Sequence, residues 1–315
     1  MNSKLAFVFP GQGSQSVAML NDLAEHHTII RQTCDSASEV LGYDLWAIIS
    51  EGPAEELNKT YIIQPALLAA GGAMWRLWQS LDGALPGMIA GHSLGEYTAL
   101  VCAEAIKFED AIKLVETRGR YMQEAVPEGS GAMAAILGLD DEKVKQVCAD
   151  AAEGDVVSAV NFNSPGQVVI AGNTAAVERA TVLAKEAGAK RAIMLPVSVP
   201  SHCSLMMAAA DRMKALLQDI EISKPVMPVI NNVDVANETS AEGIRSALVK
   251  QLYNPVRWVE TVQKMVDAEV EHVVECGPGK VLMGLNKRIS KQVNHYCIFD
   301  TASLEKTIAS FTSSK

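Results

Sequence analysis

The chain has 315 residues, of which 49% are hydrophobic and 20% charged, a composition typical of a globular protein and not of a disordered one. Its formal net charge of -10 disfavours nucleic acid as a partner, because phosphate binding needs a basic surface. Six scattered cysteines without a C-x-x-C pattern predict neither a disulfide framework nor a zinc site. With no signal peptide and no uninterrupted apolar span, we expect a cytoplasmic protein that neither enters nor crosses a membrane.

Strand-like and helix-like segments alternate along the first 125 residues. Alternation of this kind favours a parallel sheet with helices on both faces. The predicted strands are residues 5–9 and 88–90, and the predicted helices are residues 17–41, 66–81, 94–105 and 110–125. After residue 199 the alternation resumes with a helix from about residue 205 and with strands at residues 227–230, 270–275 and 296–299.

The middle of the chain has a different rhythm. Asn163-Ser164-Pro165-Gly166 is a strong turn signal between two short strands, and the whole segment reads β-α-β-β-α-β, the ferredoxin-like order. Its strands are predicted at 132–137, 156–162, 167–171 and 191–197, and its helices at 140–152 and 175–187. We therefore expect an α/β core from residues 1–128 and 200–315, with a ferredoxin-like subdomain inserted at residues 129–199.

Ser93 is the first candidate for chemistry. It lies in Gly91-His92-Ser93-Leu94-Gly95, between a predicted buried strand and a predicted helix. On such a turn the hydroxyl projects out of the sheet, and the helix N-terminus directs backbone N–H groups at an oxyanion formed there. The alternative is that Ser93 simply caps the helix after a glycine turn.

A serine nucleophile needs a base, and His202 is the best placed of the six histidines. It follows a predicted strand in an irregular segment with two prolines, and it precedes an alanine-rich helix. Loops at strand ends are where α/β enzymes assemble their sites. His92, next to Ser93, is expected to shape the turn instead.

Arg118 lies on the apolar face of its predicted helix, in line with Val115 and Met122. A buried guanidinium is costly unless an anion or hydrogen-bond acceptors meet it. It is either half of a structural salt bridge or a fork that grips a substrate carboxylate in two places.

The loop Pro10-Gly11-Gln12-Gly13-Ser14-Gln15 follows the first strand but lacks the pattern of a phosphate-binding loop. Such a loop beside the serine turn is able to donate a backbone N–H to an oxyanion.

Together these motifs resemble the malonyl-CoA:acyl carrier protein transacylases in their discrete bacterial form. Further matching segments are Tyr253-Asn254-Pro255-Val256-Arg257-Trp258 and Glu275-Cys276-Gly277-Pro278-Gly279, and the resemblance runs from residue 4 to at least residue 285. It implies an α/β-hydrolase-like core that carries the ferredoxin-like subdomain.

The resemblance also implies roles. Ser93 would be the nucleophile that becomes malonylated, and His202 its general base and acid. The backbone N–H groups of Gln12 and Leu94 would form the oxyanion hole. Arg118 would bind the malonyl carboxylate, and the backbone carbonyl of Gln251 would orient His202.

The implied function is transfer of a malonyl group from coenzyme A to the phosphopantetheine thiol of acyl carrier protein, with no metal or other cofactor. Fatty acid synthesis is the default pathway for this family, and of the oligomeric states, which the sequence leaves open, we expect a monomer. Two alternatives stay open: a serine hydrolase or thioesterase, and a non-catalytic module that binds carrier proteins. The preference between malonyl and methylmalonyl groups also stays open, as does the pathway that the product enters. An acidic carrier would dock on a local basic patch, with candidates at Lys190, Arg191, Lys280, Lys287, Arg288 and Lys291.

Overall fold

A computed structural model describes residues 1–197 and 199–312 and contains two separate sheets. The larger is a five-stranded sheet in the order β7-β2-β1-β8-β9, and all its paired neighbours run parallel. Its strands are β1 (Asn2–Phe9), β2 (Pro86–Gly91), β7 (Val229–Ile230), β8 (His272–Cys276) and β9 (Asn294–Ile298).

The central strand β1 shows why helices cover both faces of this sheet. Successive side chains of a strand point to opposite faces. Leu5, Phe7 and Phe9 enter the main core, whereas Ala6 and Val8 enter a second core on the other face.

Helices pack against each of the two faces. The main core packs against α2 (Thr28–Leu41), α5 (Thr60–Ser80), α6 (Leu94–Cys102), α7 (Phe108–Glu124) and α10 (Met207–Gln218). The opposite face packs against α12 (Trp258–Asp267) and α13 (Val281–Ile289). The remaining helices are α1 (Asn21–His26), α3 (Leu45–Glu51), α4 (Ala54–Leu57), α11 (Ala241–Gln251) and α14 (Thr301–Thr312), with a 3-10 turn at Ser204–Met206. In the described part of the chain, no helix combines the length and apolarity that a bilayer crossing requires.

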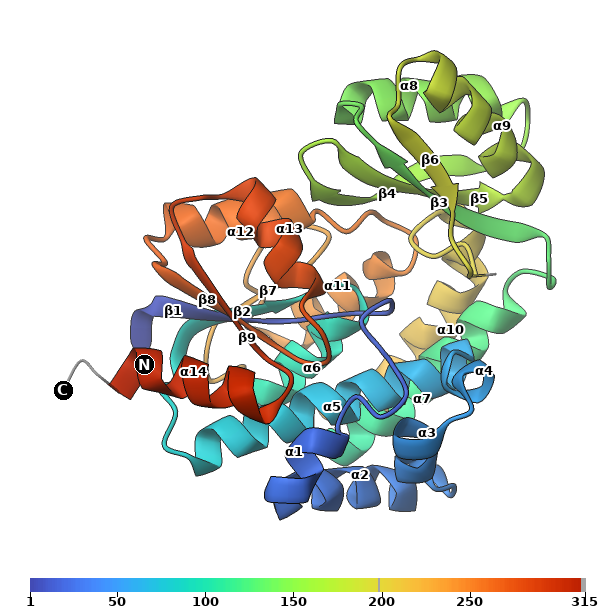
Figure 1. Ribbon diagram of the computed structural model, residues 1–315. Helices are drawn as coiled ribbons and strands as arrows, with labels where there is room; N and C mark the ends of the chain where they lie inside the picture. The colour runs from blue at the N-terminus through green and yellow to red at the C-terminus, as the bar shows by residue number, and fades with distance from the viewer. Residues whose placement is uncertain (198, 313–315) are drawn as a thin grey trace.

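The smaller sheet stands to one side of the main body (Figure 1). Its order is β4-β5-β3-β6, with every paired neighbour antiparallel, and α8 (Asp141–Ala152) and α9 (Thr174–Glu186) pack on one face. The strands are β3 (Gly131–Leu137), β4 (Val157–Ser164), β5 (Gln167–Asn173) and β6 (Arg191–Met194). This connectivity is the predicted ferredoxin-like arrangement, and all its elements fall within residues 131–194.

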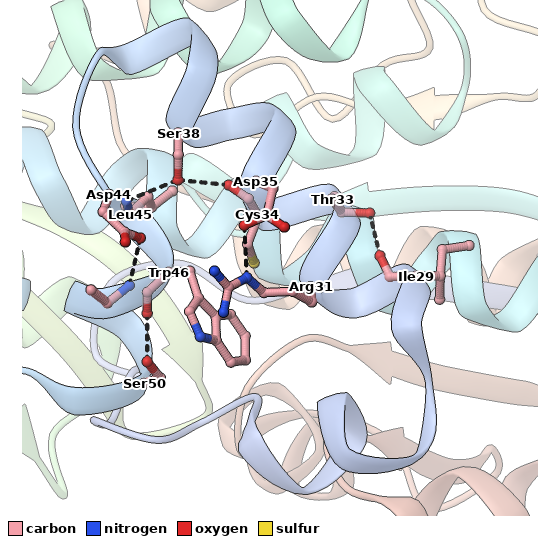
Figure 2. Close-up of polar contacts among 11 residues, drawn as sticks. Ile29, Arg31, Thr33, Cys34, Asp35, Ser38, Asp44, Leu45, Trp46 and Ser50 are labelled. Carbon is pink, nitrogen blue, oxygen red and sulfur yellow. Dashed lines mark hydrogen bonds and ion pairs between the residues drawn. The ribbon is translucent and has the colours of Figure 1, made fainter.

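The helices before α5 differ most from the prediction. The helix expected over residues 17–41 is two helices, because His27 adopts an extended backbone between α1 and α2. The short helices α3 and α4 were not predicted. A local polar network joins α2 to α3 (Figure 2): the Ser38 hydroxyl accepts from Leu45 N at 2.9 Å, and Asp44 caps α3 through Ala47 N at 2.9 Å.

Two predicted strands are shorter than expected, and proline explains both. The strand predicted at residues 227–230 is reduced to Val229–Ile230, which begins directly after Pro228. The strand predicted at residues 191–197 ends at Met194, two residues before Pro196. A proline has no N–H to contribute to a strand ladder.

Candidate active site

Ser93 lies at the turn between β2 and α6 in a strained backbone conformation, with φ 51° and ψ -108°. Strain of this kind costs about 1–3 kcal/mol and persists where the surroundings impose it. The hydroxyl makes no capping bond to α6, so the interpretation of Ser93 as a simple helix cap is wrong. It lies instead 2.8 Å from Nε2 of His202.

Two glycines let the turn pack this tightly. A Cβ on Gly91 would lie 1.8 Å from the carbonyl carbon of Gly95, and a Cβ on Gly95 would lie 2.0 Å from the backbone oxygen of Phe9. Both glycines are therefore required by the close approach of strand and helix.

His202 is buried at 3% exposure and also has a left-handed backbone, with φ 66°. Its backbone N–H donates to Leu252 O at 2.9 Å, and its Nδ1 lies 2.7 Å from the backbone oxygen of Gln251. Because a carbonyl oxygen only accepts, Nδ1 carries the proton and donates to the Gln251 carbonyl. Nε2 is then unprotonated and free to accept the Ser93 proton.

The position of Gln251 explains how a backbone carbonyl can hold the histidine. Gln251 is the last residue of α11, and the final carbonyls of a helix have no partner within it. The helix dipole also makes this end partly negative, which favours a transient positive charge on His202.

Burial, together with the nearby Arg118 cation, lowers the pKa of His202 to about 3. The imidazole is therefore neutral at physiological pH, as a general base must be.

Arg118, on α7, is 2% exposed and is held by neutral groups. Its Nη1 donates to Oε1 of Gln64 at 2.6 Å, and its Nη2 donates to Oε1 of Gln251 at 3.0 Å. Over residues 1–197 and 199–312, no carboxylate lies within ion-pair distance of it. The structural salt bridge is therefore ruled out for this part of the chain.

The guanidinium also reaches the nucleophile, with Nη2 3.5 Å from Ser93 Oγ. Its central carbon, Cζ, lies over the ring of Tyr97, 5.3 Å from the ring centroid. A positive charge thus lies beside the serine, and its hydrogen-bond partners within residues 1–197 and 199–312 are uncharged oxygens.

Gln12 and Leu94 lie on the two segments expected to form an oxyanion hole. Leu94 N is the first N–H of α6, so it has no acceptor within the helix. The loop that carries Gln12 packs directly on the serine turn, because a Cβ on Gly11 would lie only 2.5 Å from His92 O.

These residues open into a cavity of about 440 Å³ between the two sheets. The large body contributes Gln12, Gln64, Ser93, Leu94, Arg118 and His202, and the small sheet and its connections contribute Met133, Asn161 and residues 195–197. The size suits a small acyl group and a flexible thiol arm.

Three further polar residues complete the site and were not predicted. Gln64 holds Arg118, as described above. The side chain of Asn232 accepts from Ser93 N at 2.7 Å and donates to Gly91 O at 2.6 Å. Glu96, 2% exposed, accepts from Gln251 Nε2 at 2.8 Å and from Asn232 N at 2.9 Å. Asn232 follows strand β7, and the carboxyl end of a parallel strand was the signal that could have found it.

His92 contributes to the wall of the site. Its Nε2 lies 2.8 Å from Oδ1 of Asn163, and its ring packs against Trp258 with centroids 5.5 Å apart. Because Asn163 belongs to β4 and Trp258 to α12, His92 links the serine turn to both bodies, in keeping with its expected shaping role.

The comparisons with known proteins agree with this arrangement. The acyl transferase domain family matches residues 6–303. The malonyl CoA-acyl carrier protein transacylase of Salmonella typhimurium is 58% identical over 306 residues, which cover 97% of this chain and 99% of that protein. This chain belongs to the malonyl CoA-acyl carrier protein transacylase family.

Other transacylases support the same assignment. The enzyme of Escherichia coli strain K12 is 61% identical over 287 residues, covering 91% of this chain and 93% of that one. A malonyl-transacylase solved in complex with a type II PKS acyl-carrier protein has a TM-score of 0.97 and 58% identity, covering 98% of this chain and 99% of that chain. The acyl carrier protein S-malonyltransferase of Vibrio cholerae has a TM-score of 0.94 and 60% identity, covering 96% and 99%. The predicted α/β fold of a transacylase is thereby confirmed.

Proposed function

We propose that this chain moves a malonyl group from coenzyme A to the phosphopantetheine thiol of acyl carrier protein, through an ester on Ser93, and that it supplies fatty acid synthesis. The observation that carries this proposal is Arg118, a buried cation 3.5 Å from the serine oxygen whose other hydrogen bonds go to the amide oxygens of Gln64 and Gln251. Such a fork is complementary to an acyl group that ends in a carboxylate.

The first half-reaction forms the ester. Ser93 Oγ attacks the thioester carbonyl while His202 Nε2 takes its proton. The N–H groups of Gln12 and Leu94 stabilise the oxyanion. When the tetrahedral intermediate collapses, the C–S bond breaks and the coenzyme A thiolate takes the proton from His202.

The second half-reaction reverses these roles for a new thiol. The phosphopantetheine thiol gives its proton to His202 and its sulfur attacks the ester carbonyl. Collapse then breaks the C–O bond, and His202 returns the proton to Ser93. One thioester replaces another, so the exchange needs neither an oxidant nor a cofactor.

Labelled malonyl-CoA tests the proposal. Intact-mass measurement should show one added malonyl group, peptide mapping should locate it on Ser93, and holo-acyl carrier protein should then remove it. Ser93→Ala should take up no label. Release of free malonate without transfer would instead indicate a hydrolase, and full transfer activity in Ser93→Ala would refute the ester mechanism.

The carrier protein is proposed to dock on a local basic patch, and the two candidate groups lie on β6 and on α13. Arg288 on α13 reaches the small sheet, where it donates to Gln167 at 2.8 Å. Arg191 on β6 lies at the same end of the small sheet, because Arg191 and Gln167 are both paired with Leu137. Charge reversal on α13, as in Lys287→Glu, should raise the KM for the carrier protein and leave the KM for malonyl-CoA nearly unchanged. A parallel rise in both would contradict this docking site.

We further propose that the enzyme works as a monomer in the cytoplasm. Each residue assigned a role above comes from a single chain. The six cysteines are free thiols, the state that a reducing compartment maintains. Light scattering of the purified protein tests the monomer, and a stable dimer at working concentration would contradict it.

A further inference from the structure

The side chain of Gln251 has a second connection, separate from the backbone carbonyl that holds His202. This side chain is fully buried. Its Nε2 donates to Glu96 Oε2 at 2.8 Å and to Ser93 O at 3.1 Å, while its Oε1 accepts from Arg118 Nη2 at 3.0 Å. One amide therefore bridges the Glu96 carboxyl group and the Arg118 guanidinium.

The chemistry of an amide makes its orientation decisive. One end carries two donor protons and the other carries only acceptor lone pairs. Arginine has donors and no acceptors. If the Gln251 amide were reversed, its N–H groups would face the guanidinium of Arg118, and its oxygen would face the oxygens of Glu96 and Ser93. Both contacts would then be repulsive.

Glu96 supplies the stronger of the two acceptors that prevent this reversal. Its Oε2 accepts from Gln251 Nε2 and also from the backbone N–H of Asn232 at 2.9 Å. The side chain of Asn232 in turn holds the backbone N–H of Ser93. The carboxyl group of Glu96 thus connects to the cation and to the nucleophile through one intervening residue each, while the Glu96 backbone N–H donates to Ser93 O at 3.1 Å.

We propose that Glu96 is a positioning residue that sets the acyl selectivity of the site. By accepting the Gln251 N–H it turns the amide oxygen toward Arg118, and so keeps the guanidinium beside Ser93 with a neutral partner. A carboxylate in direct contact with Arg118 would compete with the substrate anion, whereas a carboxylate one amide away orients the fork and leaves it open to that anion. This inference rests on the proposed malonyl transfer and adds a residue to which no role was assigned.

Substitutions at Glu96 separate its acceptor role from its charge. Glu96→Gln keeps an acceptor oxygen in place, so the ratio of kcat/KM for malonyl-CoA to that for acetyl-CoA should stay within about threefold of wild type. Glu96→Met has similar length and no acceptor. Losing a charged hydrogen bond is worth about 1.5–3 kcal/mol, so the ratio should fall by roughly 10- to 150-fold, chiefly through a higher KM for malonyl-CoA.

Glu275 offers a matched control. It is equally buried, at 1% exposure, and its carboxyl oxygens accept from Leu282 N and Met283 N at the start of α13. Burial raises the pKa of Glu96 and of Glu275 alike to about 7. Glu275→Met should therefore lower the melting temperature as Glu96→Met does, but should leave the malonyl-to-acetyl ratio unchanged.

The outcomes separate this inference from the proposed function. If wild type itself shows no preference for malonyl-CoA, the proposed function fails. If wild type prefers malonyl-CoA but Glu96→Met keeps the same ratio, or Glu275→Met loses as much of it, the positioning role of Glu96 is overturned. Should Glu96→Met not accumulate in folded form, Glu96→Asp, which withdraws the carboxyl group by one methylene, should still lower the ratio, and an unchanged ratio there would also overturn the role.

Discussion

Replacing Arg118 by alanine should remove much of the preference of the enzyme for malonyl over acetyl groups. With malonyl bound, the guanidinium of Arg118 gains a carboxylate; with acetyl bound, it keeps the uncharged oxygens of Gln64 and Gln251 and no carboxylate from the substrate. A buried charge left without its partner costs about 3–5 kcal/mol. Since these two amide bonds already satisfy part of the fork, the lower end, about 3 kcal/mol, is the better guide, which corresponds to a discrimination of roughly 150-fold.

The assay is transfer to holo-acyl carrier protein from malonyl-CoA and from acetyl-CoA, with kcat/KM measured for each. In Arg118→Ala the malonyl value should fall by about two orders of magnitude, while the acetyl value should fall less or rise. Arg118→Lys retains the charge but cannot bind a carboxylate in two places, so its kcat/KM for malonyl-CoA should lie between those of wild type and Arg118→Ala. Equal proportional losses for both substrates in Arg118→Ala would refute the argument.

Two further predictions concern stability. Folding lowers the pKa of His202 from 6.5 to about 3, so between these values the unfolded chain binds a proton that the folded chain does not, and stability is lost as the pH falls from about 6.5 toward 3. His202→Gln should therefore show a smaller drop in melting temperature between pH 7 and pH 5 than wild type. An identical drop would contradict the shift. Gly95→Ala should cost more than about 3 kcal/mol or prevent folding, because its Cβ would meet Phe9 O at 2.0 Å, whereas Gly284→Ala, with no atom within 4 Å, should gain about 0.5–1 kcal/mol in urea unfolding.

The sequence located Ser93 and Arg118 because each broke a local pattern. Ser93 interrupted a strand-to-helix transition between two glycines, and Arg118 interrupted an apolar helix face. The β-α-β-β-α-β rhythm predicted the smaller sheet in its correct order. Where proline or an extended residue such as His27 cut an element short, apolar periodicity alone overestimated its length.

The neutral residues of the site could not be predicted in this way. Gln64 lies in the long apolar helix α5, and Asn232 follows a strand of only two residues. A neutral amide on a helix or after a strand lacks the large desolvation cost of a buried charge, so nothing in a single sequence marks it as unusual. Its role depends on contacts between residues far apart in the sequence, such as Gln64 and Arg118, which are 54 positions apart. The role of Gln251 came from family resemblance alone, since any residue has a backbone carbonyl.

The geometry also couples substrate charge to the strength of the base. Burial and the Arg118 cation both lower the pKa of His202, and Ser93 Oγ lies 2.8 Å from the imidazole and 3.5 Å from the guanidinium. Through Ser93 Oγ these two groups lie at most about 6 Å apart, and at that separation, with an effective dielectric near 20, such a cation acts on a protonated imidazole with about 2–3 kcal/mol. A malonyl carboxylate on Arg118 cancels much of this field, so the pKa of His202 should rise and the base should strengthen only when the correct acyl group is bound. Single-turnover acylation at saturating substrate should therefore lose activity at a higher pH with malonyl-CoA than with acetyl-CoA, and coincident acid limbs would show that the two charges act independently.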